Sequence, residues 1–237
     1  MFNQNQYWKD VDKHLISLSS EGYVKLPSIS EMDLNNASQH ISEDMQNSTF
    51  KELSSSHQAF LEDFGIHNFL TPKLFELAKS KFRYKGEINN QYHVGRRVEP
   101  GNSKEMYRAH FDSHLFTMVI PLKIPHNNND NGTKGDLIYF PKARSAPRGE
   151  LTNIIAKASH KKFASFNGIN EFSKNHDMHE DDFSDYCPLL FIGNTTLHTN
   201  KPVTKDSSSY RLTLLAHFFD PSPKFGIGSL LRLIRNR

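Results

Sequence analysis

The chain of 237 residues has one cysteine, one tryptophan and no long apolar run. Cys187 has no second cysteine with which to form an internal disulfide, so nothing points to an oxidising compartment. No stretch approaches the roughly 18 consecutive apolar residues of a membrane-spanning helix. The polar segment 1–12 lacks the apolar region of a secretory signal. These absences predict a soluble, cytoplasmic protein.

The sequence also lacks a strong charge of either sign. Its 29 Lys and Arg residues against 26 Asp and Glu residues give a net charge of +3, which does not predict a nucleic-acid partner. The 18 Phe and 8 Tyr residues are sufficient for a sizeable core. We therefore expect one domain, with helical support over 1–87, a β core over 88–220 with an insertion at 142–187, and a tail over 221–237.

Apolar spacing predicts helices in the first third of the chain. Trp8, Val11, Leu15 and Leu18 repeat at helical intervals, and a further helix is expected from about residue 30. Thr71 followed by Pro72 is typical of an N-cap with proline in the first helical position, which predicts a helix running to about residue 82. Segment 21–27 has the pattern of a turn leading into a short strand.

From about residue 88 the pattern favours short strands separated by turn residues. The expected strands cover 89–98, 108–121, 135–141, 189–193, 198–203 and 210–219. This arrangement predicts a mainly β fold with flanking helices, in the form of a sandwich or barrel. Segment 142–187 interrupts the strands, with a short helix expected at 150–157, and can be read as a substrate lid or as a solvated surface excursion.

Two histidines and one carboxylate form a candidate metal site. His110 and Asp112 are two residues apart in the expected strand 108–121, so their side chains should project from the same face, together with Arg108, His114, Phe116, Met118 and Ile120. His198 follows an expected strand and a turn, and can lean back across a neighbouring strand. Two His and one Asp can hold an iron ion and leave other positions open.

A histidine and an aspartate at this spacing are weak evidence alone, because the chain has 13 His and a hydrogen-bonded structural His is the ordinary alternative. The downstream residues favour the metal site. Arg211 lies 13 residues after His198, and Arg211 and Thr213 share a strand face, so that both can reach one carboxylate. The alternative for Arg211 is a surface ion pair on an edge strand.

In order and spacing, His110-Phe111-Asp112, His198 and Arg211-Leu212-Thr213 resemble the signature of the iron(II)/2-oxoglutarate-dependent oxygenases. Pro100-Gly101-Asn102 with Tyr107 is similar to the prolyl-hydroxylase branch. Segment 21–24 looks like the entry of the phytanoyl-CoA hydroxylase-like branch. The resemblance covers about residues 89–220.

This resemblance implies a double-stranded β-helix, the jelly-roll or cupin-like fold. It also implies that His110, Asp112 and His198 bind Fe(II), that Arg211 and Thr213 hold the distal carboxylate of the co-substrate 2-oxoglutarate, and that O2 completes the reaction. Prolyl-hydroxylase-like members often carry a Tyr just before the Pro-Gly pair, where this chain has Val98 and Glu99. Gln91 is our choice for the missing co-substrate contact, with Tyr92 and Arg97 as alternatives.

The implied activity is that of a dioxygenase that hydroxylates a small, possibly acidic, lipid- or sugar-linked metabolite. Because related halogenases replace the metal-binding Asp by a small residue, Asp112 favours hydroxylation. The alternatives are a hydroxylase of peptide or protein side chains, a cupin-type metal-binding protein without oxygenase activity, and a catalytically silent 2-oxoglutarate sensor.

Three further groups of residues have both a functional and an ordinary interpretation. A ring of cations at the site would suit an acidic substrate, although ordinary surface charge is the more economical interpretation of Arg96, Arg97, Arg108, Lys142, Arg144 and Arg148. His176, His179 and the acids at 180–182 resemble a second metal cluster, but a solvated loop is favoured. Segment 225–237 has three Arg and no acid, which fits either peripheral contact with the inner membrane surface or a docked or frayed basic end.

Overall fold

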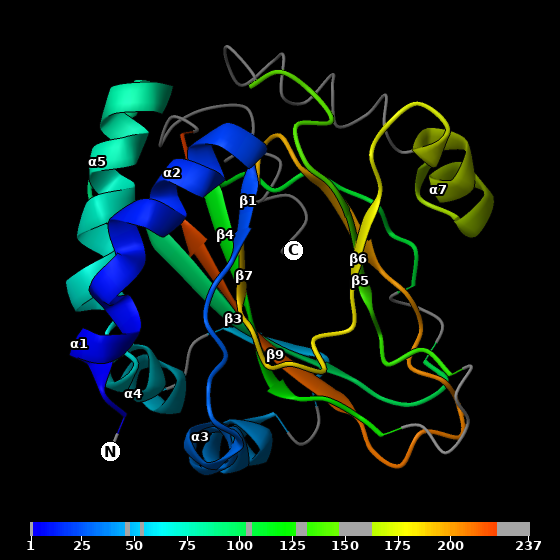
Figure 1. Cartoon of the computed structure of the whole chain (residues 1–237). Helices are drawn as coiled ribbons and strands as arrows, with labels where there is room; N and C mark the ends of the chain where they lie inside the picture. Colours follow the sequence, from blue (N-terminus) through cyan, green and yellow to red (C-terminus); the bar gives the residue numbers. More distant parts are fainter. Residues whose placement is uncertain are drawn as a thin grey trace, which may run out of the picture.

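Two antiparallel sheets face one another, with helices on their outer sides (Figure 1). The computed structural model describes residues 2–45, 48–52, 55–102, 106–126, 132–146 and 163–221. The predicted helix at 150–157, Arg148 and the tail segment 225–237 lie outside these residues. The jelly-roll core predicted from the sequence is confirmed.

Helices dominate the first third of the chain, as predicted. They are α1 (Gln4–Tyr7), the 3-10 turn η1 (Trp8–Asp10), α2 (Val11–Glu21), α3 (Glu31–Asp44), α4 (Ser55–Asp63), the π-helical turn η2 (Ile66–Leu70) and α5 (Thr71–Phe82). The later helix α7 spans Phe166–Ser173. Within the described residues, none of these helices has both the length and the apolar character required to cross a bilayer.

The predicted N-cap at Thr71 is wrong. Leu70 already has helical backbone angles and belongs to η2, so Thr71 continues a helix instead of starting one. The Thr71 hydroxyl is buried and has no hydrogen-bond partner among the described residues, so it caps no helix. Pro72 still lies in the first turn of α5, where proline is tolerated because the first helical N–H groups have no intrahelical partner.

The larger sheet has six strands in the order β1-β7-β4-β9-β3-β2. Their bounds are β1 (Tyr23–Lys25), β2 (Phe50–Glu52), β3 (Gln91–Val98), β4 (Phe116–Lys123), β7 (Leu189–Ile192) and β9 (Arg211–Phe218). The N-terminal third therefore contributes both edge strands, of which β1 was expected and β2 was not. The central pairs β4–β9 and β3–β9 carry the residues on which the candidate site depends.

The smaller sheet has three strands in the order β6-β5-β8. Their bounds are β6 (His179–Asp181), β5 (Leu137–Phe140) and β8 (Leu197–Asn200). His198 of β8 also forms an isolated antiparallel bridge with His110, which adds the segment around His110 to this sheet next to β8. Because β6 comes from segment 142–187, that segment supplies part of the core sheet, and the expectation of a solvated loop around residues 176–182 is wrong for β6.

The predicted continuous strand over 108–121 is also wrong. Residues 113–115 form a bend, and β4 begins only at Phe116. The bend breaks the alternation of side chains, so Phe116, Met118 and Ile120 pack against the N-terminal helices instead of sharing a face with Asp112. Asp112 instead lies on the same side as Thr117, and its carboxylate accepts a hydrogen bond from the Thr117 hydroxyl.

Three apolar clusters hold the layers together. The largest fills the space between the N-terminal helices and the outer face of the larger sheet, and includes Leu18, Leu74, Phe116 and Phe218. A second lies between the two sheets, with Tyr139, Phe183, Leu189 and Phe191. The third packs α7 against the outer face of the smaller sheet through Phe140, Ile169 and Phe172. Each fully buried side chain of this size contributes about 1.5–3 kcal/mol.

Strand β9 alternates between these layers as the sequence predicted. Leu212, Leu214, Ala216 and Phe218 join the cluster beneath the helices, and Arg211 and Thr213 are buried on the other face. Phe219 departs from the predicted pattern, because its left-handed backbone (φ 63°) returns its ring to the helix side. The interior face of β9 therefore carries Arg211, Thr213, Leu215 and His217 in succession.

One buried histidine of β3, His93, faces the N-terminal helices. His93 is 5% exposed, and its Nε2–H donates to the side-chain oxygen of Gln91 (3.1 Å). The ring of His67 lies 6.0 Å from it. Burial, and then the nearby His67, His217 and His114, lower the pKa of His93 to about 3.

We expect His93→Gln to flatten the dependence of stability on acid in the metal-free protein. The folded-state pKa of His93 lies below the unfolded value of 6.5, so its contribution is present above pH 6.5 and is lost as the pH falls towards 3. Between pH 7.5 and pH 4, the free energy of unfolding should fall by about 2–3 kcal/mol more in the wild type than in the variant. Urea unfolding at pH 7.5 and pH 4, with chelator present, measures the difference, and parallel pH slopes for the two proteins would contradict it.

Candidate metal centre

Backbone pairing brings the two histidines together. The N–H of His110 donates to the carbonyl of His198 and the N–H of His198 donates to the carbonyl of His110, each at 3.0 Å. Residues opposite each other in an antiparallel pair project to the same face, and the two imidazole rings are 4.4 Å apart between centroids. The pairing therefore fixes two of the three predicted ligands side by side.

Asp112 is held by the turn after β7. Its N–H donates to the carbonyl of Gly193 (3.1 Å), and the N–H of Gly193 donates to the carbonyl of Leu115 (2.8 Å). A Cβ atom at Gly193 would lie 2.7 Å from Thr117 Oγ1 and 3.1 Å from Asp112 Cβ. Only glycine leaves room for the carboxylate at this position.

The ligand atoms of the three residues converge. Asp112 Oδ1 lies 3.6 Å from His110 Nε2 and 3.7 Å from His198 Nε2, and the ligand atoms of the three residues all lie within 4.8 Å of one another. Among the described residues, no other group of three His, Cys, Asp or Glu side chains converges in this way. The side chain of His110 is 57% exposed and that of His198 is 10% exposed, so the group opens to solvent on one side.

Hydrogen bonds select the imidazole nitrogen that faces the centre. His110 Nδ1–H donates to the carbonyl of Arg108 (2.8 Å), and His198 Nδ1–H donates to the carbonyl of Thr196 (3.2 Å). The Nε2 lone pair of each ring is then directed towards Asp112. This is the usual outer support of a metal-binding histidine.

The electrostatics favour the protonation states that bind a divalent cation. Burial acts to raise the pKa of Asp112, but His198, His217 and His110, together with the Thr117 hydroxyl, hold it well below its usual range. Burial lowers the pKa of His198, and partial desolvation, together with the nearby His198, lowers the pKa of the more exposed His110. An ionised carboxylate and two neutral imidazoles are the forms in which these residues act as ligands.

Two residues that the sequence did not single out as supports orient Asp112. Thr117 Oγ1–H donates to Asp112 Oδ2 (2.5 Å) and accepts from His217 Nδ1–H (3.0 Å). Thr117 and His217 are direct cross-strand partners on β4 and β9. The hydroxyl holds Oδ2 and leaves Oδ1 for a metal. The link depends on the register between distant strands, which single-chain patterns do not reveal.

Arg211 and Thr213 line a cavity between the sheets. Both are 3% exposed, and Arg96 joins them because it is the cross-strand partner of Thr213. Arg96 also donates to Asn200 Oδ1 on β8. Burial, and then the charge of Arg96, lower the pKa of Arg211 to about 10. Two guanidinium groups with little solvent make this cavity suited to an anion.

The packing around Arg211 is consistent with an anion subsite. Its Nη1 atom is buried and has no hydrogen-bond partner among the described residues. At Gly135, which has φ +82°, a Cβ atom would lie 3.0 Å from Arg211 Cδ and 3.3 Å from Arg211 Nη1. The glycine leaves space beside the guanidinium. The residues present thus fit a carboxylate held by Arg211.

The structure does not bring Gln91 to this group. Gln91 lies on the other face of β3, where its side chain bonds His93 and the carbonyl of Ile88. Arg97, one of the two alternatives, also lies on that face, with its guanidinium 3.7 Å from the centroid of the Tyr210 ring. Tyr92 is the alternative that lies on the interior face, and its ring stacks near His217 and His114.

Five of the six cations considered in the sequence lie within the described residues, and these five do not gather at one opening. Lys142 donates to the carbonyl of Ser20 on α2. Arg144 lies over the ring of Phe111 (3.9 Å) and donates to the carbonyl of Asn194 (2.7 Å). With Arg96 in the interior cavity and Arg97 on the outer face, Arg108 is the exposed cation left beside the ligands. The described residues therefore favour ordinary structural roles for most of these charges.

The second histidine cluster also has structural roles. His179 stacks on Tyr139 in the smaller sheet, with ring centroids 5.2 Å apart. His176 stacks on Phe172 of α7 at 3.8 Å. The two histidines belong to different layers, so they do not form the second metal cluster.

Structural comparison shows which known proteins share this fold. A prolyl-4-hydroxylase from Pseudomonas putida matches 89% of this chain and 99% of its own, with a TM-score of 0.53 and 10% identity. A prolyl 4-hydroxylase from Phytophthora capsici matches 99% of this chain and 74% of its own, with a TM-score of 0.57 and 11% identity. The non-heme alpha-ketoglutarate-dependent carbocyclase SnoK from nogalamycin biosynthesis matches 93% of this chain and 90% of its own, with a TM-score of 0.55 and 14% identity.

The chain has the fold of these oxygenases. No protein-family model and no curated protein sequence matches it. At identities of 10–14%, the agreement concerns the arrangement of the backbone. The chemistry must be argued from this chain's own residues.

We expect Thr117→Val to weaken metal binding about 10- to 100-fold, because Asp112 Oδ2 loses its hydrogen-bond donor. Thr117→Ser keeps the hydroxyl and is the matched control. Titration calorimetry with Mn(II) measures both affinities without depending on turnover. Equal affinity of the Val and Ser variants, with both folded, would show that the hydroxyl does not position the carboxylate.

Proposed function

We propose that this protein is an Fe(II)- and 2-oxoglutarate-dependent dioxygenase. The observation that carries the proposal is the convergence of His110 Nε2, His198 Nε2 and Asp112 Oδ1 within a few ångströms, at the open end of a jelly roll. Two His and one carboxylate with open positions are typical of non-haem iron oxygenases. Bound iron with 2-oxoglutarate would supply oxidation of a substrate C–H bond by O2, with succinate and carbon dioxide as co-products.

The residues of the chain bind and orient the reactants in this proposal. His110 and His198 present neutral Nε2 atoms, and Thr117 keeps the Asp112 carboxylate turned so that Oδ1 faces them. Arg211 holds the distal carboxylate of 2-oxoglutarate, with Thr213 and Arg96 beside it. Burial of these groups excludes water and strengthens each charge-assisted hydrogen bond.

The substrate would enter on the side where His110 is exposed. Tyr92 is 39% exposed and stacks near His114, so these two rings form a wall beside the ligands. This opening supports a small organic substrate that packs against an aromatic surface. The scattered cations give little support for a strongly acidic substrate.

Hydroxylation of a peptide or protein side chain is the second candidate. It is favoured by the two prolyl 4-hydroxylases among the proteins of similar fold. The epimerase SnoN and the carbocyclase SnoK have the same fold, so another oxidative outcome on a small molecule belongs to the same proposal. A panel containing proline-rich peptides and small metabolites separates the two classes.

We expect the wild type, with Fe(II) and O2, to release succinate from 2-oxoglutarate, and Asp112→Ala to release none. The Ala variant removes the only carboxylate of the ligand group, so bound Fe(II) should also fall at least tenfold. Asp182→Ala is a control at an exposed carboxylate outside the group. Succinate is measured by chromatography and iron by elemental analysis.

Each rival function predicts a different result in these assays. A silent sensor would bind 2-oxoglutarate without releasing succinate, and a cupin-type metal protein would bind metal alone. Wild-type iron content in Asp112→Ala would contradict the ligand assignment itself.

We expect Arg211→Ala to raise the Kd for 2-oxoglutarate at least tenfold while Mn(II) binding changes little. The variant removes a charge-assisted bond to the distal carboxylate and leaves the metal ligands intact. Arg83→Ala, at the exposed C-cap residue of α5 and outside the cavity, is the control. Calorimetry in the presence of Mn(II) measures the affinity. An unchanged Kd for 2-oxoglutarate would assign Arg211 a purely structural role.

A further inference from the structure

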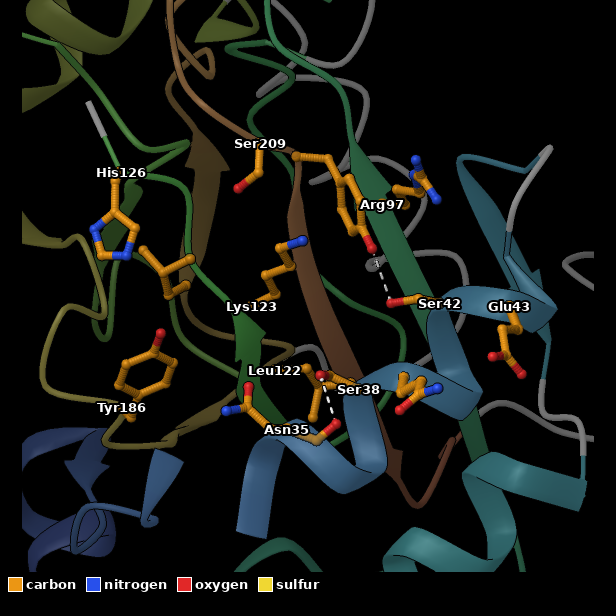
Figure 2. Close-up of a pocket in the computed structure, with 13 residues that line it drawn as sticks. Asn35, Ser38, Ser42, Glu43, Arg97, Leu122, Lys123, His126, Tyr186 and Ser209 are labelled. Atoms are coloured by element: carbon orange, nitrogen blue, oxygen red, sulfur yellow. Dashed lines mark hydrogen bonds between the residues drawn. The ribbon is translucent and has the colours of Figure 1, made fainter. Parts of the chain in front are cut away.

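A second cavity lies on the opposite side of the larger sheet from the metal centre. It has a volume of about 420 Å³ and separates α3 from the ends of β3, β4 and β9 (Figure 2). This volume falls in the range of about 300–1,000 Å³ that is typical of small-molecule sites. Nothing in the proposed dioxygenase activity uses this cleft.

Helix α3 presents a polar stripe to the cleft. Leu34 and Ile41 of α3, and Met45 at its C-cap, are fully buried in the core, whereas Met32 in its first turn is exposed. The residues that line the cleft are instead Asn35, Ser38, Gln39, Ser42 and Glu43. A helix that only packed on a sheet would carry apolar side chains on its facing surface. The polar stripe therefore indicates that this gap is not filled by ordinary core packing.

Two cations flank the ring of Tyr210 at one end of the cleft. The guanidinium of Arg97 lies 3.7 Å from the ring centroid and the ammonium of Lys123 lies 4.3 Å from it. The Tyr210 hydroxyl donates to Ser42 Oγ (3.0 Å), which fixes the ring against α3. Arg97 is paired with Glu99 (2.5 Å). Lys123 forms no ion pair with a carboxylate in the described part of the chain.

Ser209 lies on the same side of the cleft as Lys123 (Figure 2), so an ammonium and a hydroxyl border one space. Leu122 and Ile124 line the cleft beside it, and because both are largely buried they offer only a small apolar surface. Glu43 is at the far end, beyond Ser42 (Figure 2). The charge that faces the apolar part is therefore positive.

We propose that this cleft binds a small organic anion. Its carboxylate or phosphate head lies against Lys123 and Ser209, and its short apolar or aromatic body packs against Leu122 and Ile124. The site is separate from the interior anion cavity, although the two lie back to back across the sheet. Arg96 and Arg97 are consecutive on β3, and Tyr210 and Arg211 are consecutive at the start of β9, so one member of each pair points to each side.

The test uses benzoate as the probe and benzamide as its uncharged counterpart, with Mn(II) and saturating 2-oxoglutarate present to occupy the interior site. We expect wild-type protein to bind benzoate at least tenfold more tightly than benzamide, because only benzoate gains the bond to Lys123. Lys123→Met should abolish this preference. Lys174→Met, at the exposed C-cap residue that follows α7, is the matched control and should keep it.

A second variant tests the cleft independently of charge. Gln39 is exposed on α3 at the edge of the cleft, so Gln39→Trp should fold, fill the space and exclude both probes. Ligand-observed NMR and calorimetry measure binding, and thermal unfolding confirms that each variant is folded. Absence of benzoate binding to the wild type, or equal binding to wild type, Lys123→Met and Gln39→Trp, would overturn the proposal.

Discussion

One pairing of backbone segments, between residues 110 and 198, determines the geometry of the candidate metal centre. It makes the two imidazoles neighbours and leaves their Nε2 atoms on the interior side. Asp112 is bound differently, to the turn at Gly193 and to Thr117 of β4. The histidines thus belong to the smaller sheet and the carboxylate to the larger one. The three ligands converge because the apolar residues between the sheets, such as Tyr139 and Phe191, fix the distance between the layers.

The sequence could predict the candidate ligands because each lies in a short local pattern. His110, Asp112 and His198 lie in short patterns, and the alternation of Arg211 and Thr213 along β9 needs only the period of a strand. The bend at 113–115 could not be found in the same way. Its residues continue an apolar and polar alternation, and the break arises from contacts with Gly193 and Phe219, which are distant in sequence.

The supporting residues required knowledge of strand register. Arg96 reaches the interior cavity because it lies opposite Thr213, and His217 reaches Asp112 because it lies opposite Thr117. A shift of one residue in either pairing would turn these side chains to the helix side. The same alternation along β3 explains why the Gln91 side chain does not reach the site. Gln91 is one residue from Tyr92, which has the interior position, so Gln91 faces the helices and bonds His93 there. The pattern within one strand does not show which of two such neighbours faces the interior.

The buried guanidinium of Arg211 carries an electrostatic cost that a bound anion would lower. A guanidinium loses hydration when it is buried, and here burial and the neighbouring Arg96 together lower its pKa to about 10. The carboxylates of Asp136 and Asp181 act in the opposite direction, but Nη1 still has no hydrogen-bond partner in the described structure. A buried donor without a partner costs about 1–3 kcal/mol, and more when it is charged. The fold sustains this cost through the apolar layers around β9, and a bound carboxylate would remove it. The arrangement therefore favours a site selected for anion binding over one selected for stability.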